Sequence, residues 1–95
     1  MEEKNIYKGL NFKDEEILLK LQGICERLGV EVRYESGDFE GGLCKVNDKQ
    51  ILVVNKSLPL SSQIAIMAKA LGSMDLDNVY IIPVIRELLN SYKDG

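Results

Sequence analysis

The strongest constraint on the fold of this chain is a strict alternation of apolar and charged residues over residues 30–35 (VEVRYE). Successive side chains of a β-strand point to opposite faces, so Val30, Val32 and Tyr34 share one face and require burial. A strand of this kind needs neighbouring strands and a packing partner for its apolar face. The chain has 95 residues, which is enough for one small domain with one modest core.

Two further strands are predicted immediately downstream, at residues 43–46 (LCKV) and 50–55 (QILVVN). Turn-forming residues separate the three strands, at positions 36–38 (SGD) and 47–49 (NDK). Two short connections in a row favour an antiparallel meander, because antiparallel neighbours can be joined by tight turns.

The faces of these strands can also be predicted. Cys44 shares a face of its strand with Val46, and Cys44 is expected in the core. On the third strand, Ile51 and Val53 are expected to face the core, which leaves Leu52 and Val54 on the opposite face. Three strands covered on one side only would then expose an apolar patch, a feature typical of a protein–protein interface.

Three helices are expected around the strands. Residues 14–28 carry one apolar stripe at helical spacing, and Gly29 can end that helix. A second helix carries Ile64, Met67, Ala68 and Leu71 on its inner face and ends at a glycine, and a third starts at Pro83. The predicted fold is α+β, a three-stranded antiparallel meander with helices packed mainly on one face, in the order α-β-β-β-α-α.

The domain boundaries follow from the same patterns. Residues 1–12 are predicted to be a flexible or packing N-terminal arm, residues 13–92 a single α+β domain, and residues 93–95 a frayed tail.

Composition excludes several functional classes. The net charge is −3 and the basic residues are scattered, so the chain lacks the clustered positive charge that nucleic acids require. No apolar run approaches the ~20 residues of a membrane helix, and the polar start MEEKN is unlike a signal peptide. We therefore expect a cytoplasmic protein with reduced thiols at Cys25 and Cys44, and no nucleic-acid or membrane partner.

The chain contains no histidine. This absence removes histidine-based acid–base catalysis, Ser–His and Cys–His nucleophile pairs, and nearly every type of catalytic zinc site. We expect no catalytic residue, no metal ligand and no cofactor. The alternative is an enzyme of another type that uses Cys44, Lys69 or carboxylates.

The order of these elements resembles the small zincin-like domain of the ImmA/IrrE family of metallopeptidases. The residues that carry the resemblance are LGVEV at 28–32, ILVVN at 51–55, LPL at 58–60 and the helix QIAIMAKALG at 63–72. The resemblance covers roughly residues 14–75. It implies a zincin-like fold in which one helix would carry the HExxH zinc motif.

All three motif positions depart from that family. Lys69 stands in place of the first histidine, Ala70 in place of the glutamate and Ser73 in place of the second histidine. An ammonium group repels Zn²⁺, alanine cannot accept a proton, and a lone serine is a poor zinc ligand. The resemblance therefore implies a pseudoenzyme without metal. The alternative is that the helix is simply amphipathic.

The function expected from these observations is a small non-catalytic interaction or regulatory module. Its partner is another protein or a second copy of the chain in a homodimer, with Leu52 and Val54 as candidate self-association residues. The N-terminal arm, which contains Ile6, Tyr7, Leu10 and Phe12, is an alternative cover for the same face.

A second hypothesis is a small-ligand sensor, with Lys69, Tyr80 and Arg86 as candidate binding residues. Tyrosine and arginine are the side chains most often used as anchors at interfaces.

Overall fold

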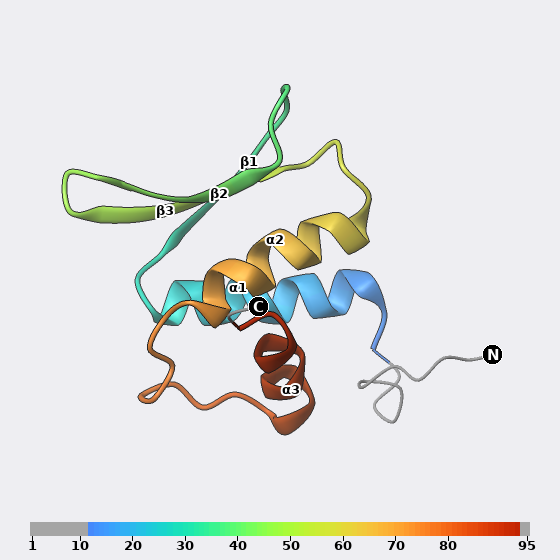
Figure 1. Ribbon diagram of the computed structural model, residues 1–95, viewed down its shortest axis with the longest axis vertical. Helices are drawn as coiled ribbons and strands as arrows, with labels where there is room; N and C mark the ends of the chain where they lie inside the picture. Colours follow the sequence, from blue (N-terminus) through green and yellow to red (C-terminus); the bar gives the residue numbers. More distant parts are fainter. Residues whose placement is uncertain (1–11, 94–95) are drawn as a thin grey trace.

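The computed structural model describes residues 12–93. The elements appear in the predicted order of one helix, three strands and two helices (Figure 1). They are α1 (Asp14–Arg27), β1 (Glu31–Glu35), β2 (Gly41–Val46), β3 (Lys49–Asn55), α2 (Leu60–Gly72) and α3 (Pro83–Ser91).

The fold is α+β, with a sheet, a layer formed by α1 and α2, and α3 on the side away from the sheet (Figure 1). Because both helices of the middle layer lie on one side, no helix within residues 12–93 covers the other face of the sheet. The predicted packing of helices on one face is therefore confirmed. The core between the layers contains the fully buried residues Ile17, Leu21, Leu52, Val54, Met67 and Leu71.

The predicted antiparallel meander is wrong, because the sheet is mixed. Its strand order is β1-β3-β2, with β1 parallel to β3 and β2 antiparallel to β3. After β1, the chain crosses the C-terminal end of β3 and returns along β2, on the other side of β3. The central strand is therefore β3, and β2 forms one edge.

The connection between β1 and β2 explains why this crossing is possible. Residues 36–40 can span up to ~17 Å when extended, whereas two strand spacings amount to only ~10 Å. Asn55 at the end of β3 holds the crossing segment, since its Nδ2 donates hydrogen bonds to the carbonyl oxygens of Gly37 (2.9 Å) and Phe39 (2.6 Å). A short connection therefore does not require that its two strands be neighbours.

The predicted faces of β3 are also wrong. Leu52 and Val54 are 0% exposed and belong to the core cluster, whereas Val53 is only half-buried and lies on the opposite face. Four consecutive apolar residues carry no alternation, so periodicity could not assign them to a face. The pairing decides it, because Leu52 lies between Val32 of β1 and Leu43 of β2.

The same pairing corrects the position of Cys44. It pairs with Ile51 on the helix-free face and is exposed, not in the core. Leu43, its neighbour, packs against the core instead. Cys25 is buried in α1 as predicted.

The predictions for the two ends of the chain can be compared with the structure only in part. Phe12 packs against the core, and the Nζ of Lys20 lies 4.8 Å from the centre of its ring. The rest of the predicted arm and the last two residues lie outside the described residues. Within residues 12–93, no helix combines the length and the apolar composition needed to cross a membrane.

Candidate functional site

Strand β2 presents free backbone groups along one edge of the sheet. In an antiparallel ladder, alternate residues direct their N–H and C=O groups toward the neighbouring strand or away from it. The N–H of Asn55 donates to the carbonyl oxygen of Glu40 at 3.0 Å. By alternation along this register, Gly42 and Cys44 bond to β3. The backbone groups of Gly41, Leu43 and Lys45 consequently point outward.

The first residue of β2 must be glycine. Gly41 has φ of +132°, and a Cβ at this position would collide with the carbonyl oxygen of Val53. Its neighbour Gly42 differs, since a Cβ there would meet nothing within 4 Å. The absence of a side chain at Gly41 thus allows the crossing segment to enter the sheet close to β3.

A cleft of about 390 Å³ lies between this end of β2 and helix α2. The strand and the residue before it contribute one wall, and α2 and its C-terminal end contribute the other. The lining residues are Glu40, Gly41, Gly42 and Leu43 on one side and Ile66, Lys69, Ala70 and Ser73 on the other.

Helix α2 is held in place by its opposite, buried face. Met67, Ala68 and Leu71 are fully buried in the core. At the start of the helix, the Nε2 of Gln63 donates to the carbonyl oxygens of Leu58 (2.9 Å) and Lys56 (3.3 Å) and so fixes the connection from β3. The spacing of 3.6 residues per turn then directs a second stripe of α2 toward the cleft.

The polar groups of the cleft are a carboxylate, an ammonium group and a hydroxyl. Glu40 and Lys69 supply opposite charges, and the Oγ of Ser73 donates to the carbonyl oxygen of Ala70 at 2.7 Å. Among residues 12–93, no three His, Cys, Asp or Glu side chains come together in a way that could hold a metal ion. The arrangement can recognise a backbone edge and side chains of either charge.

Neither cysteine lines this cleft. Burial, followed by the nearby charge of Glu26, raises the pKa of the Cys25 thiol to about 11, so this thiol is protonated at neutral pH. A buried, protonated thiol is a poor nucleophile and a poor metal ligand.

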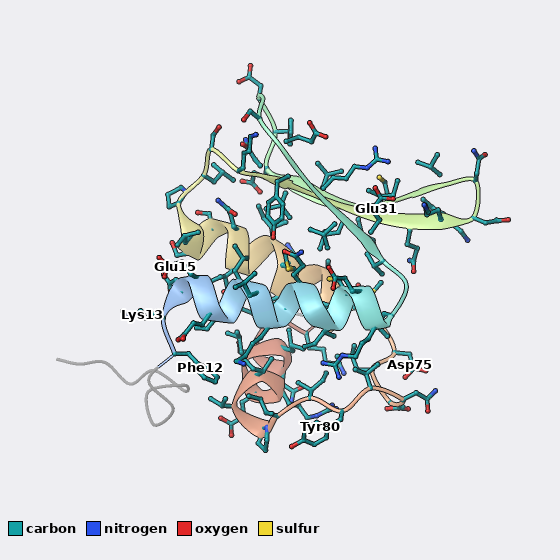
Figure 2. All side chains as sticks on the ribbon, turned by 180° about the vertical axis from the view of Figure 1, so that it is seen from behind. Phe12, Lys13, Glu15, Glu31, Asp75 and Tyr80 are labelled. Atoms are coloured by element: carbon teal, nitrogen blue, oxygen red, sulfur yellow. The ribbon has the colours of Figure 1, made fainter. Side chains whose placement is uncertain are left out.

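The charges on the helix-free face of the sheet are paired with one another. The Glu31 carboxylate, labelled in Figure 2, lies 2.7 Å from the Nε of Arg33 and 3.3 Å from the Nζ of Lys49. Hydrogen bonds from Arg33 and then from Lys49 lower the pKa of Glu31. Exposed pairs of this kind contribute little to stability.

The three residues predicted to bind a small ligand lie in three different cavities. Lys69 lines the cleft beside β2, and Tyr80 lines a groove beside α1. Arg86 lines a third cavity, of about 130 Å³, together with Asp75 and Asp77. The structure does not bring them together into one site.

The predicted self-association residues are not at the surface. Leu52 and Val54 are buried within the chain itself, so they offer no contact to a second copy in this fold.

The edge positions Gly41, Leu43 and Lys45 were not predicted as functional. A hairpin is indicated by the glycine pair and by the turn at Asn47 and Asp48, since both of these turn residues have a positive φ. Either strand of the β2–β3 hairpin could lie at the edge of the sheet. Strand β2 lies at the edge because β1 pairs with β3, on the far side of the hairpin.

Comparisons with known proteins yield no relative: no family model, no curated protein and no solved structure matches this chain.

Proposed function

We propose that this chain is a non-catalytic interaction module that binds an extended peptide segment along β2. The observation that carries the proposal is the row of outward backbone groups at Gly41, Leu43 and Lys45, directly beside the cleft against α2. An added strand satisfies such groups through a regular ladder, and alternate side chains of the added strand enter an adjacent pocket.

The side chains around the edge suit this role. Leu43 and Ile66 give the cleft two apolar contacts, and Lys69 gives it a cation that would favour an acidic side chain of the peptide. Edge strands that are not used for binding are commonly protected by proline, by bulges or by a covering element. Within the described residues, β2 pairs with β3 alone, so no strand occupies its outer edge.

The non-catalytic part of the proposal rests on the residue types. The chain has no histidine, and α2 and the residue that follows it bring only alkyl groups, an ammonium group and a hydroxyl group to the cleft. The resemblance to the ImmA/IrrE family supports the same location. Lys69, Ala70 and Ser73, which stand at its three motif positions, all line this cleft. On this hypothesis, a metal-free relative of a peptidase has kept a peptide-binding surface.

The proposal can be tested with peptides selected from a displayed random library on the immobilised full-length protein. The affinity of a selected peptide would then be compared between Lys45→Pro and Lys45→Ala. Proline removes the outward N–H of this edge residue without removing a bond to β3, and edge positions of this kind tolerate proline. We expect Lys45→Pro to weaken binding at least tenfold and Lys45→Ala to weaken it less than threefold.

Two checks make the result interpretable. Unchanged circular dichroism and amide spectra in both variants would show that the β2–β3 ladder is intact. Equal affinity of the two variants, or failure to select any peptide that competes at this edge, would reject strand addition to β2.

A further inference from the structure

A further cavity, of about 350 Å³, adjoins the cleft beside β2. We call it the Asp75 cavity, after the carboxylate in its wall. Its lining residues are Leu28, Leu43, Gln50, Ser73, Met74 and Asp75. Leu43 and Ser73 also line the cleft, so the cleft and the Asp75 cavity form one continuous groove.

The two parts of this groove follow each other along β2. Strand β2 and helix α2 run in the same general direction (Figure 1). The cleft lies between Gly41 and Gly42 on the strand and Lys69 on the helix, whereas the Asp75 cavity lies between Leu43 and the residues that follow α2. A strand added along β2 directs alternate side chains to the same face, ~7 Å apart. One such side chain can enter the cleft, and the next on that face can enter the Asp75 cavity.

The wall of the Asp75 cavity combines apolar surface with hydrogen-bond acceptors. Its apolar part comes from Leu28, Leu43 and Met74. The acceptors include the carboxylate of Asp75 and the side-chain carbonyl of Gln50. Lysine and arginine side chains match this combination, because their alkyl stems pack on apolar surface while the charged end stays in a polar environment.

The charge of the Asp75 cavity differs from that of the cleft. Glu40 and Lys69 bring opposite charges to the cleft, whereas Asp75 alone is charged among the described residues that line its cavity. The N–H of Asp77 donates to the Oδ1 of Asp75 at 3.0 Å, which orients the carboxylate. Arg86 and Asp75 both border a smaller cavity, but within residues 12–93 no cation lies within 4.0 Å of the Asp75 carboxylate.

We propose that the Asp75 cavity binds a lysine or arginine side chain of the strand that adds to β2, two residues away from the side chain that enters the cleft. This inference rests on the proposed function and specifies the chemistry of the bound segment. The alkyl stem packs on Leu43 and Met74, and the cationic group pairs with Asp75. Asp75 is exposed, so water screens the pair, and we expect it to change the affinity by about threefold to fivefold.

The test uses a peptide that is selected from the displayed library and whose binding is weakened by Lys45→Pro. We expect this peptide to contain a lysine or arginine, which is changed to glutamine in a second peptide. Both peptides are titrated into the unaltered full-length protein and into Asp75→Asn. Asparagine keeps the Oδ1 acceptor for the N–H of Asp77 and removes only the charge. Each change alone should weaken binding about threefold to fivefold, and both together should weaken it no further, because they remove the same pair.

The matched control is Asp77→Asn, which removes a carboxylate from the smaller cavity and none from the Asp75 cavity. It should leave the affinity of the unaltered peptide unchanged. Equal losses in Asp75→Asn and Asp77→Asn, independent effects of the peptide and protein changes, or edge-binding peptides without a basic residue would overturn this inference and leave strand addition intact. Selected peptides that are all insensitive to Lys45→Pro would instead reject strand addition itself, and this inference with it.

Discussion

Asn55 is the residue on which the strand order depends most directly. It is 4% exposed, and a buried amide is tolerated only when it is hydrogen-bonded. Its Nδ2 donates to the carbonyl oxygens of Gly37 and Phe39, and its Oδ1 accepts from the N–H of Ser57 at 2.9 Å. One side chain therefore ties the segment that crosses from β1 to β2 to the end of β3.

Replacing this residue should destabilise the protein. We expect Asn55→Ala to lower the free energy of unfolding by about 2–4 kcal/mol, because three hydrogen bonds at ~0.5–1.5 kcal/mol each are lost. Urea denaturation followed by circular dichroism would measure this loss of stability. The matched control is Asn78→Ala, at an exposed residue, which should change the free energy of unfolding by close to zero. A loss below ~0.5 kcal/mol would mean that the crossing segment is held by something else.

Cys25 provides a test based on pH. Its pKa is about 11 in the folded protein and 9.0 as the ordinary value, so the unfolded chain loses this proton first as pH rises. The stability that the protonated thiol contributes is therefore complete below pH 9 and is lost as pH rises toward 11. At ~1.4 kcal/mol per pKa unit, the full loss over these two units is on the order of 3 kcal/mol.

Denaturation midpoints at pH 8 and pH 10.5 would measure this loss. The variant Cys25→Ala removes the titrating group, so its stability should fall less over the same interval. If the two proteins lose equal stability, the thiol of Cys25 is not protected by burial.

At the scale of single elements, the two glycines of β2 make opposite predictions. Gly41→Ala should cost about 1–3 kcal/mol, because an alanine at φ of +132° is strained and its Cβ meets the carbonyl of Val53. Gly42→Ala should change stability by less than ~0.5 kcal/mol, since its Cβ has open space. Thermal unfolding of the pair would show the difference. Equal effects would mean that the entry into β2 is not the conformation described here.

The helices could be predicted from the sequence more closely than the sheet. Residues 14–28 were expected as a helix, and α1 is Asp14–Arg27; Pro83 was expected to start a helix, and it is the first residue of α3. Helix formation depends on local periodicity, capping and breakers, all of which can be read along the chain.

The sheet was harder to predict, because pairing is decided by residues far apart in sequence. The alternation in β1 correctly placed Val32 and Tyr34 toward the core. The run from Ile51 to Val54 has no alternation, so the sequence pattern does not show which of its residues face the core. The pairing of Leu52 with Val32 and Leu43 determines this. The parallel β1–β3 pair could not be predicted from turn length, since the crossing depends on the buried side chain of Asn55.

At the scale of the whole molecule, the corrected faces change the expectation for self-association. Leu52 and Val54 lie between the sheet and the helices, so polar substitutions there should unfold the chain, not dissociate a dimer. We expect the double variant Leu52→Ser, Val54→Ser to lose more than ~4 kcal/mol of stability. Val46→Ser, at a residue 50% exposed, should be nearly neutral.

Light scattering combined with denaturation would measure mass and stability together. A double variant that stays folded while its mass falls from dimer to monomer would contradict the burial of these two side chains.

The candidate site could be predicted only in part. The position of Lys69 in the second predicted helix indicates a candidate binding residue, and Lys69 lines the cleft. The other wall depends on β2 being an edge, and this follows from strand order, which the local pattern does not contain. Residue type alone indicates Tyr80 and Arg86 as binding residues beside Lys69, and the fold separates all three.

The most direct test of the central claim is amide hydrogen exchange by NMR, with and without a selected peptide. In the free protein, the N–H groups of Gly42 and Cys44 bond to β3 and should exchange slowly, whereas those of Leu43 and Lys45 should exchange fast. Peptide bound as an added strand should slow exchange at Leu43 and Lys45 and change Gly42 and Cys44 little. Unaltered exchange at Leu43 and Lys45 in the saturated complex would contradict strand addition.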